Sequence, residues 1–417
     1  MGPVILHADV NSAFLSFEAA YRLQRGEEID LRTIPAVVGG DREKRRGIVL
    51  AKSIPSKKYD IQTGEPIAEA LRKCPHLYVA PSNYPLYEKC SRALFALFRR
   101  YTDVVEQTGL EEGFLDISDR VCNFDEILSL AHRVRNAVRE ELGFTVSVGV
   151  SSNRLLAKMA SDLRKPDYVT TLFPDEIPSK LWHLPVGDLI MVGRSTRRKL
   201  DRVGIRSIGD LAHADPAFLH RYLKSHGLLL WRYANGMESE FHAFAERAPI
   251  KSIGNSRTMP TDLTTREQAN RALLQLCEKV CARQREAGFL ASLVTVMYKN
   301  SQFFVQEHQG GLSHPTDHTN RIYEQAVRLF DEIWDGAPIR SMGVRVSELT
   351  ERRYAQISFF DPKSEEKDHR LDQSIDHLRN RFGSSSLLRA SLLGETLVTE
   401  LSSPFGDLAR DHLFRMV

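Results

Sequence analysis

Long apolar runs are missing from this sequence of 417 residues. Runs such as Leu228 to Leu230 fall far short of the roughly 20 apolar residues that a membrane-spanning helix needs. No charged and then apolar leader opens the chain. We therefore expect a cytoplasmic protein that binds no membrane, and we expect it to act as a monomer.

Signals for cysteine pairing are absent as well. The five cysteines show no CxxC spacing, and Cys277 and Cys281 are one helical turn apart. This pattern favours neither a zinc site nor a disulfide framework, and it indicates reduced cysteines that pack in the interior.

A strong excess of charge of one sign is missing too. The net charge of +3 is too small to establish a polyanionic partner by itself. The charge is unevenly distributed, because residues 194–206 carry six basic residues and one acidic residue. A solvated helix face explains such a cluster as readily as a nucleic-acid contact does.

The chain is long enough for several packed domains, since domains usually run roughly 100 to 200 residues. In its first part, alternation of apolar residues predicts strands at 4–9, 104–106, 114–117 and 144–150. Apolar residues at three-and-four spacing predict helices at 12–23, 123–142 and 155–163, with Asn123 as a cap. This order predicts an α+β fold in which helices cover an antiparallel or mixed sheet, as in a ferredoxin-like palm.

The second part begins after Phe173, where the chain becomes helical and basic. Residues 184–212 resemble a helix-hairpin-helix, in which glycine lets the backbone approach a DNA phosphate. A polar stretch at 237–249 is typical of a linker. Beyond it we expect a second split βαβ module, with strands at 251–258, 291–299, 302–307 and 340–347 and helices at 266–285 and 321–334.

Two regions place carboxylates where a metal site needs them. Asp9 ends the first predicted strand, and Glu111 and Glu112 lie in a predicted hairpin. Phosphoryl and nucleotidyl transfer use two divalent ions about 4 Å apart, and such ions prefer hard carboxylate oxygens. The three acids are candidates to hold two Mg²⁺ ions, with the backbone carbonyl of Val10 as a further ligand. Taken alone, an acidic pair in a turn is more typical of a solvated surface.

Five motifs stand in order along the chain: HADVNSAFLSFE, GLEEGFLDIS, GVSSNRLLAKMASDLRKPD, LPVGDLIMVGRSTRRKLDRVGIRSIGDLA and KSIGNSRTMPTDL. In order and spacing they resemble the motifs of Y-family DNA polymerases of the DinB and UmuC type. The resemblance covers nearly the whole chain to about Leu349.

The resemblance implies a right-hand, template-directed DNA polymerase of the translesion type that adds dNTP to the primer 3′-hydroxyl of primer-template DNA in damage tolerance. It implies a ferredoxin-like palm at 1–25 and 81–172, small fingers at 26–80, a helix-hairpin-helix thumb at 173–238, a linker at 239–250, a split-βαβ little finger at 251–349 and a tail at 350–417. Two Mg²⁺ ions are implied as cofactors, and Mn²⁺ is expected to substitute.

Position by position, Asp9, Glu111 and Glu112 match the metal-binding acids of the family. Glu111 stands where the family has aspartate, and its extra methylene shifts the carboxylate at a site where near-octahedral Mg²⁺ tolerates little displacement. We therefore expect slower catalysis with Mg²⁺ and relatively better use of Mn²⁺. Asn11 replaces a frequent acid that the family does not use as a direct ligand.

Other positions match the nucleotide-binding residues. Phe14 matches the aromatic steric gate, whose ring excludes a ribose 2′-oxygen, although an ordinary core phenylalanine is an alternative. Lys165 matches a lysine that contacts the triphosphate. Lys57 stands where the family has a phosphate-binding arginine, and it lacks the bidentate fork. Ile54 replaces a frequent phosphate-binding tyrosine.

Basic residues in the thumb and little finger are candidate phosphate contacts: Arg194, Arg197, Arg198, Lys251, Arg257, Lys299, Arg340 and Arg345. Each one alone is more typical of a solvated charge. The segment AQISFFD resembles the sliding-clamp-binding peptide of bacterial polymerases, with Gln356, Ile357, Phe359 and Phe360 as anchors. A strand packed on its own domain is the alternative, and the helix expected at 371–382 has no assigned role.

A different class of function stays open at this point. A catalytically weak or inactive relative with the polymerase fold would bind DNA and the clamp as an accessory protein. Ile54 and Glu111 favour that alternative, whereas the three acids, Phe14 and Lys165 favour the enzyme.

Overall fold

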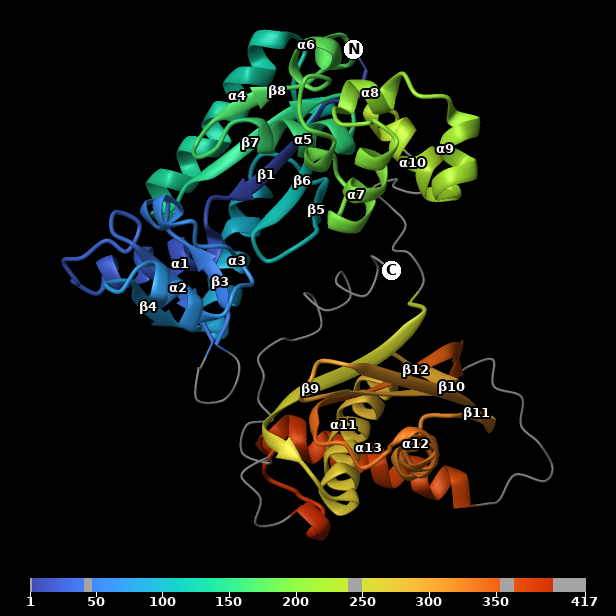
Figure 1. The fold of residues 1–417 in the computed structure, drawn as a ribbon. Coiled ribbons are helices and arrows are strands. Elements are labelled where there is room, and N and C mark those ends of the chain that lie inside the picture. Colours follow the sequence, from blue (N-terminus) through green and yellow to red (C-terminus); the bar gives the residue numbers. More distant parts are fainter. Residues whose placement is uncertain (1, 41–46, 239–249, 353–363, 393–417) are drawn as a thin grey trace. The chain divides into compact units, whose positions relative to one another are not determined.

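A computed structural model describes residues 2–40, 47–238, 250–352 and 364–392. The chain folds as two units, and the boundary in sequence between them lies after Glu246. The predicted linker therefore lies almost wholly outside the described residues. Figure 1 shows each unit with its own sheets and helices.

The N-terminal unit is built around a five-stranded sheet of order β5-β6-β1-β7-β8. Its strands are β1 (Ile5–Val10), β5 (Val105–Gln107), β6 (Glu112–Asp116), β7 (Val146–Ser151) and β8 (Val169–Thr171). The central strand β1 pairs antiparallel with β6 and β7, whereas β7 and β8 are parallel. The prediction of a mixed sheet is confirmed, and each predicted strand is present within about two residues.

The two faces of this sheet are covered differently. One face buries Leu6, Ala8 and Val10 of β1 against α1 (Ala13–Gln24), α3 (Tyr84–Phe98) and α4 (Phe124–Ala137). The other face carries the alternate residues of β1 and is covered by α5 (Arg154–Leu163). A Cβ on Gly149 would lie 1.9 Å from the carbonyl oxygen of Ala157, so glycine is what permits this helix to lie directly on the strand.

Side-chain caps fix where these helices begin. Asn123 accepts a hydrogen bond from the backbone N–H of Glu126 at 2.9 Å, which confirms the predicted cap of α4. Asn153 accepts from the backbone N–H of Leu156 in the same way at the start of α5. Capping the first turn of α5 fixes the start of the helix that lies above the candidate site.

Two smaller regions complete the N-terminal unit. A three-stranded sheet of order β3-β2-β4 consists of β2 (Ala36–Gly39), β3 (Val49–Lys52) and β4 (Tyr78–Pro81), and it packs with α2 (Ile67–Lys73). The chain then forms the short helices α6 (Ile177–Lys180), α7 (Arg194–Arg202), α8 (Ile208–Ala212), α9 (Pro216–Leu223) and α10 (Ser225–Ala234).

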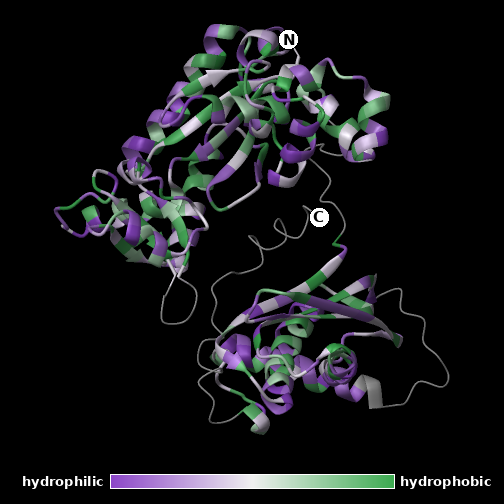
Figure 2. Ribbon diagram, in the orientation of Figure 1, coloured by the Kyte–Doolittle hydropathy of each residue, from purple (hydrophilic) through white to green (hydrophobic). Residues whose placement is uncertain are grey.

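The C-terminal unit has the predicted order β-α-β-β-α-β. Its elements are β9 (Ser252–Leu263), α11 (Arg266–Glu286), β10 (Phe289–Asn300), β11 (Val305–Thr316), α12 (Thr319–Ile333) and β12 (Ile339–Glu351). The strands form an antiparallel sheet of order β11-β10-β12-β9, with α11 and α12 on one side (Figure 1). Most strands are longer than predicted. Strand β11 shows mostly hydrophilic colours in Figure 2, and its side chains alternate between exposed and half-buried positions.

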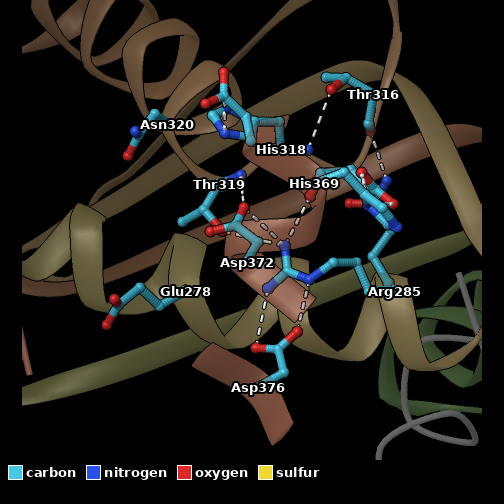
Figure 3. Close-up of polar contacts among 12 residues, drawn as sticks. Glu278, Arg285, Thr316, His318, Thr319, Asn320, His369, Asp372 and Asp376 are labelled. Carbon is cyan, nitrogen blue, oxygen red and sulfur yellow. Dashed lines mark hydrogen bonds and ion pairs between the residues drawn. The ribbon is translucent and has the colours of Figure 1, made fainter. Parts of the chain in front are cut away.

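A further helix, α13 (Ser364–Phe382), packs against α11. Figure 3 shows Arg285 of α11 between two acids of α13. The guanidinium donates to Asp376 at 2.6 and 3.1 Å and to Asp372 at 3.2 Å. Asp372 also accepts from the backbone N–H of Thr319, the first residue of α12, at 2.9 Å. The helix without an assigned role is therefore tied by buried charges into this unit.

Close by, Asp317 accepts from two more basic side chains. Arg352 donates to it at 2.6 Å, and His369 of α13 lies 3.1 Å away. The five cysteines are free, as predicted. Among the residues described, no helix combines the length and the apolar composition that crossing a membrane requires.

Candidate active site

The register of the central strands brings the predicted acids together. Asp9 on β1 lies directly opposite Glu112 on β6, and opposed residues of an antiparallel pair share one face. The backbone N–H of Val10 donates to the carbonyl of Glu111 at 3.1 Å, which holds the second acid next to the same strand end. Residues about a hundred positions apart in sequence therefore form one acidic group on the α5 face of the sheet.

Two lysines from α5 and the segment after it neutralise part of this charge. Lys158 donates to both oxygens of Glu112, at 2.8 and 2.7 Å. Lys165 pairs with Asp9 and, at 2.8 Å, with Asp162. The pairing between Asp9 and Lys165 raises the pKa of the lysine, although its burial works against this. Asp9 and Glu112 thus each have a lysine as an internal counterion.

A buried histidine adds a third contact. His7, on the same strand face as Asp9, is 1% exposed, and its Nδ1 lies 2.8 Å from Ser161 Oγ. That hydroxyl donates to the carbonyl of Lys158, so the ring nitrogen must be the donor in the contact with Ser161. The other ring nitrogen, Nε2, faces Glu112 at 3.4 Å, and it can donate to that acid only when the ring carries both protons. His7 therefore links α5 to the acid through a fixed ring orientation.

The three carboxylates differ in how well their charge is matched. Burial raises the pKa of Glu111 to about 7, and the charges of Glu112 and Asp9 add to the rise. Burial alone would raise the pKa of Glu112 as well, but His7 and Lys158 lower it to about 2. Burial raises the pKa of Asp9 against the effect of Lys165. In the part of the chain that the structure describes, no basic side chain pairs with Glu111. The ionised carboxylate of Glu111 therefore has no direct counterion.

This group fits divalent cations by its donor chemistry. Clustered carboxylate oxygens, one of them without a counterion, are what hard divalent ions bind. Within residues 2–40, 47–238, 250–352 and 364–392, no three acidic, histidine or cysteine side chains converge tightly enough to hold a metal ion as they stand. The physical reason is visible in the contacts, since Asp9 and Glu112 point to lysines. Metal binding would require these side chains to exchange partners.

Phe14 lies in the first turn of α1, shortly after Asp9 in the sequence. Its ring stacks on Tyr87 of α3 at 4.7 Å between centroids and 11° between planes. It also packs edge-on against Tyr84 at 6.2 Å and is only partly buried. The aromatic ring of Phe14 is thus packed against two tyrosines, and part of the ring remains exposed to solvent.

The remaining nucleotide-binding candidates lie elsewhere in the N-terminal unit. Lys57 is exposed in the short helix Pro55–Tyr59, and Ile54 just before it is 49% exposed. Asn11 donates to Thr145 Oγ1 at 3.0 Å and accepts from Ser147 at 2.9 Å. The amide of Asn11 is therefore bound to β7 rather than free to act as a metal ligand.

The predicted DNA contacts fall into two groups. Arg194, Arg197 and Arg198 are all exposed on α7, one face of which buries Leu200. In the C-terminal unit, Lys299 and Arg345 alternate with buried neighbours such as Tyr298 and Val344, so they lie on the sheet face opposite the helices. Arg345 is paired with Glu307 at 2.8 Å.

The other basic candidates of this unit differ among themselves. Lys251 is exposed before β9, and Arg340 lies where the pairing of β12 with β9 is irregular. Arg257 requires a correction, because it lies opposite the buried Met342, on the helix-covered face, with Nε and Nη2 buried. The predicted clamp anchors Gln356, Ile357, Phe359 and Phe360 lie outside the described residues.

Sequence reasoning missed His7, Lys158 and Ser161. The signal available was their place within the quoted motifs, since His7 precedes Asp9 by two residues on a strand and Lys158 precedes Ser161 by three on a helix. The sequence could not show that close packing of α5 on the sheet places Lys158 at Glu112 and Ser161 at His7.

Comparison with solved structures defines the class of fold. The chain matches a chimera of the Y-family DNA polymerases Dbh and Dpo4 with a TM-score of 0.71 and 22% identity, over 83% of this chain and 99% of the other. The fold is thus the α+β fold of Y-family polymerases.

Comparison of sequences then gives the family. The profile of the impB/mucB/samB family matches residues 8–162, and that of its C-terminal domain matches residues 250–359. The chain is 41% identical to DNA polymerase IV of Clostridium acetobutylicum over 94% of this chain and 99% of the other. It is 33% identical to DNA polymerase IV 1 of Bacillus subtilis over 99% and 97%. The chain belongs to the DNA polymerase IV family of Y-family translesion polymerases.

Membership of this family establishes a DNA-directed DNA polymerase that binds primer-template DNA and dNTP. The family generally uses divalent metal ions. The prediction of a DNA-directed DNA polymerase is confirmed, and the alternative of an inactive accessory protein is set aside. The helix α13 lies beyond the residues that the family profiles match.

Proposed function

We propose that Asp9, Glu111 and Glu112, with the backbone carbonyl of Val10, hold two divalent ions, Mg²⁺ or Mn²⁺, for nucleotidyl transfer. The observation that carries the proposal is the opposed pair of Asp9 and Glu112 beside a half-buried Glu111 that has no basic partner. When bound, such ions neutralise charge on the attacking 3′-oxygen and on the triphosphate. Lys158 pairs with Glu112 and Lys165 pairs with Asp9, and Lys165 would contact the triphosphate once divalent ions take its place at Asp9.

The test is primer extension with Asp9→Ala in Mg²⁺ and in Mn²⁺. We expect a loss of at least about a thousandfold in rate, because a metal ligand contributes several kcal/mol of charge stabilisation. Asp103→Ala is a matched control, since Asp103 is 90% exposed and pairs only at the surface with Arg120. Extension that survives in the Asp9 variant would show that the metal site lies elsewhere.

We further propose that the extra methylene of Glu111 shifts metal preference. Near-octahedral Mg²⁺ tolerates misplaced ligands poorly, so Glu111→Asp should raise the rate with Mg²⁺ more than the rate with Mn²⁺. The measurement is the ratio of the two rates in wild type and variant. An unchanged ratio would count against the idea.

The stacked ring of Phe14 supports a role in sugar selection. The ring rests on Tyr87, which limits its movement, and a rigid ring can exclude a 2′-hydroxyl. Phe14→Ala should lower the preference for dNTP over rNTP, and equal discrimination by both proteins would remove this assignment. Lys57 is proposed as a point-charge contact to the nucleotide phosphates, which Lys57→Ala should reveal as a raised KM for dNTP.

For DNA, the proposed contacts are the exposed cations of α7, namely Arg194, Arg197 and Arg198, and those of the C-terminal sheet, namely Lys251, Lys299, Arg340 and Arg345. Their removal should weaken binding on all sequences and lower its salt dependence. Arg257 is omitted because its guanidinium is largely buried.

The proposed domains keep the predicted limits of palm, fingers, thumb and little finger, with the little finger extended by α13. We also keep the monomeric state and sliding-clamp binding by Gln356, Ile357, Phe359 and Phe360 as proposals. Gln356→Ala should abolish stimulation of primer extension by the clamp without changing extension in its absence.

A further inference from the structure

The turn between β10 and β11 exposes two adjacent aromatic rings. Phe303 is 62% exposed and Phe304 is 61% exposed, and Val305 beside them is 45% exposed. Large apolar side chains gathered at one exposed turn typically mark a contact surface. We call Phe303, Phe304, Lys299 and Arg340 the aromatic turn.

The backbone of the aromatic turn is held in one conformation. Asn300 Oδ1 accepts from the backbone N–H of Gln302 at 3.0 Å and from that of Phe304 at 2.9 Å. The backbone N–H groups of Asn300 and Phe303 pair with the carbonyls of Phe304 and Asn300, both at 3.0 Å. Phe303 has a φ of +67°, which a bulky side chain rarely adopts. The chain therefore keeps the ring exposed at a cost in strain, as is common at functional positions.

Two cations flank the exposed ring. The guanidinium of Arg340 lies 4.8 Å from the centroid of Phe303, and the ammonium of Lys299 lies 5.9 Å from it. Neither cation forms an ion pair within the described residues, in contrast with Arg345, which pairs with Glu307. An exposed aromatic ring beside unmatched cations complements a nucleobase and its phosphate, since bases stack on aromatic rings and phosphates attract cations.

We infer that the aromatic turn binds unpaired template DNA, with a nucleobase stacked on Phe303 or Phe304 and adjacent phosphates near Lys299 and Arg340. A purely apolar protein partner fits less well, because it would bury two cations without compensating charge. The inference deepens the proposed phosphate contacts of Lys299 and Arg340 and adds a contact to the base. It needs no sequence preference, since every base has a face that can stack.

The test compares two DNA molecules with the full-length protein. One is a primer-template with a 5′ single-stranded overhang, and the other is the blunt duplex of the same paired length. Binding is measured by fluorescence anisotropy for the double variant Phe303→Ala, Phe304→Ala. We expect about tenfold weaker binding to the overhang substrate and less than twofold change on the blunt duplex. Equal weakening on both molecules, or no change on either, would overturn the inference.

Two further variants separate stacking from general apolar contact. Phe303→Tyr should keep wild-type affinity for the overhang, whereas Phe303→Leu should lose most of the stacking contribution. Full affinity in the Leu variant would overturn the base-stacking assignment. The matched control is Phe382→Ala, because Phe382 is 63% exposed with the guanidinium of Arg381 5.1 Å from its ring centroid but lies at the end of α13.

Charge variants distinguish this inference from the wider proposal on phosphate contacts. Lys299→Ala and Arg340→Ala should weaken binding to both DNA molecules and reduce the salt dependence. If they have no effect while the aromatic variants still lower affinity for the overhang, the phosphate proposal fails and base stacking stands. If they weaken both and the aromatic variants do nothing, base stacking fails and the phosphate proposal stands.

Discussion

Two charged clusters, one in each unit, use nearly the same inventory of side chains. The candidate active site combines Asp9, Glu111 and Glu112 with Lys158, Lys165 and His7. The second cluster combines Asp317, Asp372 and Asp376 with Arg285, Arg352 and His369, and Figure 3 shows the part of it around Arg285. In the second cluster every acid meets a basic partner, and Arg285 contacts two acids while its side chain is only 5% exposed. In the first, Glu111 has none and its pKa is raised to about 7.

The difference separates a structural cluster from a ligand-binding one. Buried charges are tolerated where hydrogen bonds and opposite charges satisfy them. The Arg285 cluster meets this condition and fastens α13 to α11 and α12. The acidic group does not meet this condition, because Glu111 has no basic partner. Its repulsion with the neighbouring acids destabilises the folded protein, and a bound cation would offset that destabilisation. Ligand-binding sites commonly lower the stability of the folded protein in this way.

The largest expected effect is at Arg285. Arg285→Met leaves Asp372 and Asp376 buried without their cation, which should cost about 3 to 5 kcal/mol of unfolding free energy. Urea unfolding measures the loss, and amide hydrogen exchange should localise it to α12 and α13. Polymerase activity on short primers should fall much less than stability.

An exposed pair in the same unit provides the control. Arg266 reaches Asp331 with Nε at 2.7 Å, but its side chain is 60% exposed. Arg266→Met should therefore cost no more than about 1 kcal/mol. Equal losses in the two variants would mean that burial of Arg285 does not explain its contribution.

A smaller effect of opposite sign is expected at Glu111. Its folded pKa of about 7 exceeds its ordinary value of 4.5, so the ionised form destabilises the folded protein progressively as pH rises from 4.5 to 7. At 1.36 kcal/mol per pKa unit this reaches about 3 kcal/mol. In metal-free buffer, Glu111→Gln should be more stable than wild type at pH 8 and equal to it at pH 5, as thermal unfolding can show.

Glu112 should respond the other way. Its pKa of about 2 lies below its ordinary value, so the ionised form contributes stability that is present above pH 4.5 and is lost as pH falls towards 2. Glu112→Gln should therefore lower stability at pH 8. If both glutamine variants shift stability in the same direction, the assignment of matched and unmatched acids is wrong.

The smallest effect concerns His7, a positioning residue rather than a catalytic one. Removing its contact with Glu112 should lower kcat about tenfold, or about 1.4 kcal/mol, with little change in KM for dNTP. His7→Gln keeps a polar group that can reach the acid, whereas His7→Leu does not. Similar kcat values for the two variants would show that the contact with Glu112 does not matter.

Much of the fold was predictable because local pattern and global structure agree. Alternation predicted β1 and β7, and three-and-four spacing with a capping asparagine predicted α4. Strand β11 was predicted too short, since Gly310, Gly311 and Pro315 resemble turn residues although the strand continues to Thr316. Partner strands override such local signals, and a single sequence does not show them.

The acidic residues of the site could be predicted from the sequence. The basic residues that contact them could not. Asp9, Glu111 and Glu112 follow from motif order, and the register of β1 with β6 brings them together as expected. Lys158 and His7 depend on how closely α5 approaches the sheet. The sequence could not show that Arg257 lies on the helix-covered face, because the polar residues of β9 do not reveal which side the helices cover. The Arg285 cluster depends on partners 87 and 91 residues away in sequence.

That separation in sequence has a consequence for synthesis. A ribosome releases Arg285 well before Asp372 and Asp376, and folding during translation proceeds from the N-terminal side. Until α13 emerges, the arginine must stay hydrated or bind elsewhere. The C-terminal unit therefore completes its packing late, after the polymerase core has already left the ribosome.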